Sequence, residues 1–218
     1  MMPDWAVISS LATAGGTLVL AMATFASVRS ANRSARVAEA ALQVNMRPLL
    51  TPSRLSDPPQ KVFFREGKYF PVEGGRGAVE FDDGTGVVYL AMSLRNAGQG
   101  IAVIHGWRFQ AGPELNPRRP DPESFRLQGL DITVAPGDIG FWEGTFRDSD
   151  DPQLAEAVEA AKVGELVNVD LLYGDHDGGQ RVISRMVLRR HVGADDKHSW
   201  LVTVVRHWNL DRPDPRSR

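Results

Sequence analysis

The chain has 218 residues, contains no cysteine and carries 25 basic against 27 acidic side chains, a formal net charge of −2. The absence of cysteine excludes disulfides, zinc–thiolate sites, iron–sulfur clusters and a thiol nucleophile. The near-neutral charge argues against general nucleic-acid binding, which normally leaves a basic excess. A hydrophobic fraction of 42% is typical of a folded protein.

An apolar stretch without charges occupies residues 5–28, after a short N-terminus at residues 1–4. A helix of this length, at about 1.5 Å per residue, exceeds the bilayer's hydrocarbon core of about 30 Å. The stretch therefore predicts a retained single-span transmembrane helix. A cleaved signal peptide and a buried soluble helix are the alternatives; the lack of basic residues before the run, and its length, favour the anchor.

Small residues recur on one face of this span, at Ser9, Thr13, Thr17 and Ala21. Such faces let membrane helices approach closely, so a homo-oligomer through the transmembrane helix is one prediction. A monomeric anchor of the same composition is the other.

A basic segment, residues 29–47, follows the span and predicts an amphipathic juxtamembrane helix. The helix is expected to stop before Pro48, because proline disfavours a helical residue before it. We expect Arg29, Arg33 and Arg36 to contact acidic lipid headgroups, so that the bilayer itself is a partner. The alternative role of this segment is a stalk that spaces a domain from the bilayer.

The arginines also predict the orientation of the anchor. No Lys or Arg precedes the span, whereas four arginines, the last at position 47, follow it. Because such residues stay preferentially on the cytoplasmic side, we expect the N-terminus outside and the C-terminal domain in the cytoplasm at the inner membrane. An extracytoplasmic domain is the alternative.

Beyond Pro48 the sequence becomes mainly β. Short alternating runs are separated by Gly, Pro, Asn and Asp, which predicts an antiparallel β-sandwich, Ig-like in architecture, over residues 48–210 and a disordered tail over residues 211–218. One short helix is expected after Asp151 as N-cap, with Gly164 beyond its end. The strands are predicted at residues 88–95, 101–109, 125–134, 139–146, 167–173, 181–190 and 199–210.

The sequence contains no phosphate-binding glycine loop, no GxSxG elbow and no HExxH motif. Asp175-His176-Asp177 offers metal-ligand chemistry, but an EF-hand loop from Asp175 would place Gly179 and Met186 at ligand positions. A hairpin turn is therefore the favoured interpretation. We predict no metal, cofactor or catalytic residue. The enzymatic alternative would use Asp175, His176, Asp177 and His207.

Arginine and tryptophan are interleaved in the C-terminal third. Arg185 and Arg189 share one face of a predicted strand, and Trp208 lies on the next. These three residues predict a partner-binding surface; the alternative is a solvated face of the sheet. The sequence as a whole favours a membrane-tethered, non-enzymatic interaction module that binds a protein or lipid partner.

The assembled segments resemble single-span, membrane-anchored β-domain proteins of high-GC bacteria. The resemblance implies architecture and brings no activity, cofactor or substrate. It is carried by the arginine-rich helix ending in Arg47-Pro48-Leu49-Leu50, by Leu94-Arg95-Asn96-Ala97-Gly98-Gln99-Gly100, by Leu172-Tyr173-Gly174-Asp175 with Gly178-Gly179-Gln180-Arg181, and by Val205-Arg206-His207-Trp208.

Overall fold

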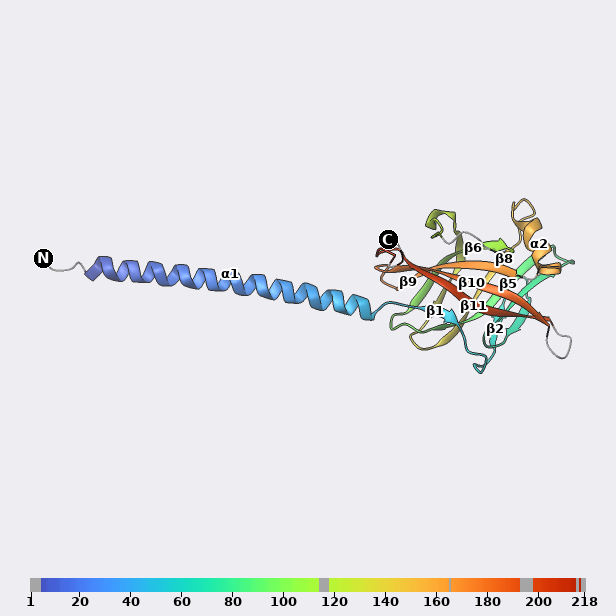
Figure 1. Ribbon diagram of the computed structural model, residues 1–218, viewed down its shortest axis with the longest axis horizontal. Helices are drawn as coiled ribbons and strands as arrows, with labels where there is room; N and C mark the ends of the chain where they lie inside the picture. Colours follow the sequence, from blue (N-terminus) through green and yellow to red (C-terminus); the bar gives the residue numbers. More distant parts are fainter. Residues whose placement is uncertain (1–4, 114–117, 165, 193–197, 215, 217–218) are drawn as a thin grey trace. The chain divides into compact units, whose positions relative to one another are not determined.

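The computed structural model describes residues 5–113, 118–164, 166–192, 198–214 and 216. The chain divides into two compact units, Met1–Asn45 and Met46–Arg218, and each is described by itself (Figure 1). The predicted N-terminal segment 1–4 and residues 215, 217 and 218 of the predicted tail lie outside the described residues.

The first unit contains one helix, α1 (Trp5–Asn45). Its part from Ser9 to Glu39 is long and apolar enough, by length and composition, to cross a membrane. The hydroxyl of Thr13 donates to the Ser9 carbonyl at 2.9 Å, and that of Thr17 to the Thr13 carbonyl at 2.8 Å. These bonds satisfy polar groups within the helix, so the threonines are compatible with an apolar surrounding. The predicted continuous helix that ends before Pro48 is confirmed.

The second unit is built from strands and a short helix, α2 (Leu154–Lys162), with a 3₁₀ turn at Pro122–Ser124. The strands among the described residues are β1 (Leu50–Pro52), β2 (Gln60–Phe63), β3 (Tyr69–Val72), β4 (Arg76–Asp82), β5 (Val87–Asn96), β6 (Ala102–Ala111), β7 (Arg126–Val134), β8 (Ile139–Phe146), β9 (Leu166–Gly174), β10 (Arg181–Val192) and β11 (His198–Asn209).

The strands form one curled antiparallel sheet in the order β1-β5-β4-β11-β10-β9-β6-β7, with β8 on the other side of β5, and a separate β2–β3 hairpin. The predicted division into two packed, Ig-like sheets is not confirmed. A short seam joins the two groups of strands: in it Gly77 of β4 lies opposite Trp200 of β11 and Arg76 opposite Leu201, and the Val202 amide donates to the Gly75 carbonyl at 3.0 Å. The sheet therefore curls into a half-barrel around a single main core (Figure 1).

Aromatic side chains fill the inside of the curl. Trp142 and Phe146 of β8 are fully buried and meet Trp107 edge to face, at centroid distances of 5.5 and 5.4 Å. Helix α2 packs against β4, β5 and β6 and buries Ala157 and Ala160 in the same core. Leu154, Val158 and Ala161 of the helix pack against the same core, so its apolar face is directed into the half-barrel.

Strand β5 is buried on both faces. The alternation from Val88 to Leu94 predicts one solvated face, but Tyr89 and Ala91 on that face are also buried. The β2–β3 hairpin covers them: Phe64 and Phe70 pack against the Tyr89 ring at centroid distances of 4.9 and 5.8 Å. The expectation of a half-buried strand is wrong because this second, smaller core lies outside the curl.

The start of α2 differs from the prediction. Gln153, not Asp151, is the residue before the first helical turn, and its side chain makes no capping bond. The Asp151 carboxylate instead accepts the Gln153 amide at 2.9 Å and forms an ion pair with Arg126. The first residues after α1 are also held in place, because Arg47 pairs with Asp211, the first residue of the predicted tail, at 2.5 Å.

Candidate functional site

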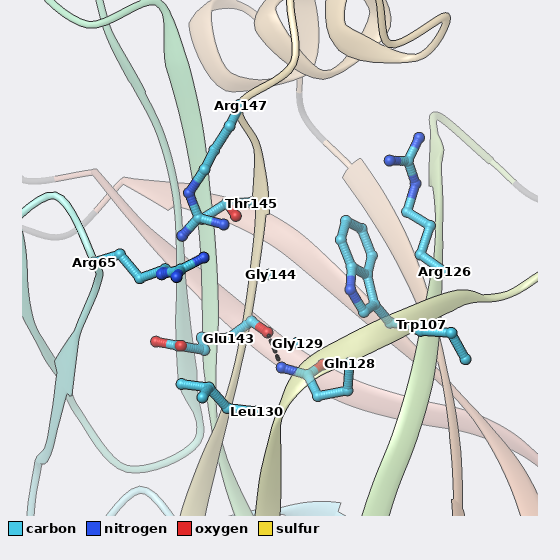
Figure 2. A pocket seen from close by; sticks show the side chains of 11 residues that line it. Arg65, Trp107, Arg126, Gln128, Gly129, Leu130, Glu143, Gly144, Thr145 and Arg147 are labelled. Atoms are coloured by element: carbon cyan, nitrogen blue, oxygen red, sulfur yellow. Dashed lines mark hydrogen bonds between the residues drawn. The ribbon is translucent and has the colours of Figure 1, made fainter.

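The sheet is left open between β7 and β8, where a cleft of about 310 Å³ lies (Figure 2). Among the described residues β7 pairs only with β6, and β8 pairs only with β5. We call this opening the β7–β8 cleft. It is lined by Arg65, Trp107, Arg126, Leu127, Gln128, Gly129, Leu130, Glu143, Gly144, Thr145 and Arg147.

A wide bulge in β7 produces the opening. Ile104 of β6 pairs with Ile132, and Gly106 pairs with Leu127, so residues 128–131 oppose His105 alone. Bulges redirect side chains and interrupt pairing. Gly106 permits the close approach of the strands, because a Cβ there would lie 2.7 Å from the Arg126 carbonyl oxygen.

A single side chain crosses the cleft. The Gln128 amide donates to the Glu143 carbonyl at 3.1 Å and accepts the Trp142 indole N–H at 3.2 Å. Since an indole can only donate, the Gln128 oxygen must face Trp142 and its nitrogen Glu143. We call these two hydrogen bonds the Gln128 bridge; Figure 2 shows the bond to Glu143. A side-chain amide thus occupies the place where backbone hydrogen bonds between β7 and β8 would otherwise complete the sheet.

Arg126 is held on the inner wall of the cleft by several contacts. The Arg126 guanidinium lies 5.4 Å from the centre of the Trp107 ring and 4.6 Å from that of Phe146. It forms an ion pair with Asp151 and donates to the Gln153 side chain at 3.0 Å. The hydrogen bond from Arg126 holds the pKa of Asp151 below its usual range. Arg126 therefore links the cleft to the start of α2.

The outer rim is charged. Arg147 pairs with Glu66, and this hydrogen bond lowers the pKa of the Glu66 carboxyl. Arg65 is exposed on the connection between β2 and β3. Burial raises the pKa of Glu143, whose Oε2 atom is buried without a hydrogen-bond partner among the described residues. In Figure 2 the side chains of Arg65 and Arg147 point to the side of β8 on which the Glu143 carboxylate lies.

The rim also carries apolar surface. Leu127 and Leu130 of β7 are 87% and 62% exposed. Single exposed leucines are ordinary, but two on an edge strand beside an open cleft mark a surface that another chain can cover. The sequence does not reveal this site by alternation, because the bulge places Gly129 between Leu127 and Leu130 and interrupts the alternation of β7.

Two of the three predicted partner-binding residues are buried. Arg185 and Trp208 are 5% and 2% exposed, and the guanidinium lies 5.1 Å from the indole ring. Arg185 donates to both Asp170 oxygens, at 2.7 and 2.9 Å. Arg189 alone is exposed, next to α2 rather than beside the other two. The three residues therefore form no common free surface. Arg29, Arg33 and Arg36 are exposed on α1.

The 175–177 segment is a hairpin turn between β9 and β10, as predicted. The Asp175 carboxylate accepts the amides of Gly179 and Gln180 at 2.7 and 3.3 Å, which holds the turn. His176 lies 3.2 Å from Asp177, and both are exposed. Among the described residues no group of three or more His, Asp or Glu side chains is arranged to hold a metal ion.

His207 belongs to a separate buried chain of hydrogen bonds. Its Nδ1 lies 2.6 Å from Ser184 Oγ, which lies 2.8 Å from the Tyr173 hydroxyl, and this hydroxyl accepts the Leu50 amide at 3.1 Å. Burial, followed by the charge of Arg216, lowers the pKa of His207; burial raises the pKa of Tyr173 to about 12. A serine next to a histidine can be a nucleophile, but Ser184 is fully buried and joins three strands instead.

Comparison of the chain with protein-family models, with curated proteins and with solved structures found no match. The resemblance to membrane-anchored β-domain proteins is therefore still a prediction. The function must be argued from the geometry of the β7–β8 cleft.

Proposed function

We propose that the protein is a membrane-anchored binding module whose β unit takes a protein partner at the β7–β8 cleft. The observation that carries this proposal is the free edge of β8, which faces β7 across an opening bridged by one side-chain amide. Free strand edges are templates for pairing with another chain. A lipid partner for this cleft is less favoured, because an acyl chain cannot pair with the backbone hydrogen-bonding groups on the free edge of β8.

For the first unit we propose a single span in the inner membrane of a bacterium. Arg29, Arg33 and Arg36 recur at intervals of four and three residues on α1, so they share one face and could contact acidic headgroups together. The arginine distribution supports a cytoplasmic β unit. A self-associating helix through Ser9, Thr13, Thr17 and Ala21 stays a prediction.

Reporter fusions at the C-terminus test this orientation. A cytoplasm-dependent fluorescent protein fused there is expected to fluoresce, and alkaline phosphatase fused at the same point is expected to be inactive. An active phosphatase together with a dark fluorescent fusion would place the β unit outside the cytoplasm.

The enzymatic alternative is the weaker proposal. Asp175 is occupied by the hairpin turn, His176 and Asp177 pair with each other, and His207 is hydrogen-bonded to Ser184. These contacts bring no nucleophile, base and cavity together around the hairpin.

Site-specific photo-crosslinking in intact cells tests the binding proposal. A photoreactive amino acid is placed at Leu130, on the rim of the cleft, or at Val163, which is equally exposed at 62% but follows α2. We expect a discrete protein adduct from position 130 that is absent from position 163. The same adducts from both positions, or none from position 130, would contradict a partner at this cleft.

A further inference from the structure

We infer that the partner enters the β7–β8 cleft as an added β-strand, which pairs with the free edge of β8, displaces the Gln128 bridge and brings an acidic side chain to Arg65 and Arg147. The inference rests on the proposed function and deepens it, because it names the chemistry of the occupant: an extended, acidic peptide segment of a protein.

The backbone of β8 is oriented for such a strand. The Glu143 carbonyl accepts its hydrogen bond from Gln128 on β7, so it points away from β5. In an antiparallel strand the N–H and C=O of one residue point to the same side, and the side alternates along the chain. Phe141 and Thr145 therefore also direct their peptide groups into the cleft. A strand placed there gains several consecutive backbone hydrogen bonds.

The Gln128 bridge shows what kind of group fits. A primary amide offers one carbonyl acceptor and an N–H donor, as a peptide group does. Its bonds of 3.1 and 3.2 Å to Glu143 and Trp142 are at the long end of the usual range. A peptide carbonyl of an added strand could accept the Trp142 indole, and its N–H could donate to Glu143. The exchange leaves neither group unsatisfied.

The charges of the cleft select an acidic occupant. Three arginines and one glutamate line it. Arg65 forms no ion pair with any described residue, whereas Arg126 and Arg147 each have one carboxylate partner. A basic segment would be repelled by the guanidinium groups of Arg65 and Arg147.

The apolar rim of the cleft predicts which residues alternate with the acidic ones in the bound segment. Side chains of a strand alternate between its two faces, so an acidic residue toward Arg65 leaves its neighbours on the other face. Leu127 and Leu130 of β7 are exposed beside the cleft and can be covered by apolar residues. The segment recognised should therefore alternate acidic and β-branched apolar side chains.

The binding of a defined peptide tests the inference on the full chain in detergent micelles. The probe is a short, blocked, fluorescent peptide of alternating Val and Glu, and fluorescence anisotropy measures its binding. We expect saturable binding that Arg65→Glu weakens by about tenfold, as expected for loss of a charge-assisted contact. Arg189→Glu, an equally drastic change at an exposed arginine outside the cleft, is the matched control and should leave binding unchanged.

Two N-methylated forms of the peptide test strand pairing itself. Methylation of alternate amides in one register removes the donors that face β8, and methylation in the other register spares them. We expect only the first form to lose binding. Equal behaviour of the two forms would overturn strand addition.

The Gln128 bridge makes an independent prediction. Gln128→Ala removes the group that the peptide must displace, so we expect binding about fivefold tighter than in the wild type. Weaker binding would mean that Gln128 contacts the ligand directly and would overturn the displacement. If no peptide binds but position 130 still crosslinks to a protein, the strand-addition inference falls and the proposed function stands; failure of both experiments removes both.

Discussion

The buried ion pair between Asp170 on β9 and Arg185 on β10 offers the sharpest test of how the β unit is stabilised. The two residues are 2% and 5% exposed, and their two hydrogen bonds measure 2.7 and 2.9 Å. Arg108 lies 3.4 Å from the same carboxylate. Breaking a pair of this kind leaves a buried charge without its partner, which costs about 3–5 kcal/mol. We expect Asp170→Asn to destabilise the β unit in that range, and Arg185→Met to destabilise it by less, because Arg108 still faces the Asp170 carboxylate.

The double variant Asp170→Leu with Arg185→Met carries the discriminating prediction. Replacing both charges by apolar side chains removes the buried pair. Arg108, which then loses its carboxylate partner, is partly exposed and still donates to the Gln110 side chain, so we expect the free energy of unfolding to stay within about 1 kcal/mol of the wild type. Urea unfolding of the full chain in micelles, followed by tryptophan fluorescence, measures all three variants. An Asp170→Asn variant that loses less than about 1 kcal/mol, or a double variant as unstable as the sum of both single variants, would refute the reasoning.

An exposed pair supplies the control for this cycle. Lys162 of α2 lies 3.2 Å from Asp83, and both side chains are largely exposed. Because of solvent screening and side-chain entropy, such exposed pairs contribute only about 0.2–1 kcal/mol to the free energy of unfolding. Asp83→Asn should therefore change stability by well under the loss expected for Asp170→Asn, although both substitutions remove one carboxylate.

Three further outcomes are expected. Stability should fall as the pH is lowered from neutrality, because His207 of the unfolded chain binds a proton near the ordinary pKa of 6.5, whereas His207 of the folded chain has a lowered pKa. A His207→Asn variant should flatten this dependence of stability on pH, and an unchanged dependence would contradict the role of His207. Gly100→Ala should strongly destabilise the β unit in thermal unfolding, since its Cβ would lie 1.7 Å from the Met46 carbonyl oxygen; an unshifted Tm would show that the segment moves freely. A fragment starting at Met46 should give a cooperative melt followed by β-type circular dichroism, because both cores lie within it; a product without a transition would argue against an independent unit.

The sequence predicts the local elements well and their pairing poorly. Strand β8 runs from Ile139 to Phe146 as predicted, because alternation and turn residues are local signals. Burial of Tyr89 depends on a hairpin that lies about twenty residues earlier in the chain, so alternation alone could not show it. Two charged positions illustrate the same limit: Arg185 looks like a surface residue until the register places Asp170 opposite it.

The cleft could not be predicted for a related reason. Gln128 and Glu143 have no motif context in the sequence, and their contact arises from the bulge between β6 and β7 and from the curl of the whole sheet. Pairing between distant strands follows the global register, which depends on every intervening bulge. Membrane orientation, in contrast, is a prediction from the distribution of arginines alone.

The curl of the sheet bears on whether the proposed strand could be added without breaking the existing sheet. The strands β8, β5, β4 and β1 form one group and β11, β10, β9, β6 and β7 the other, and the seam between β4 and β11 joins them on one side. Gly77 makes that seam narrow, because a Cβ there would lie 2.8 Å from the Ala91 carbonyl oxygen and 2.9 Å from a Leu188 methyl group. On the other side, β7 and β8 are held by the Gln128 bridge alone among described hydrogen bonds. Entry of a strand therefore exchanges two side-chain hydrogen bonds, each contributing about 1 kcal/mol, for a row of backbone bonds, and it leaves the ladder of the sheet intact.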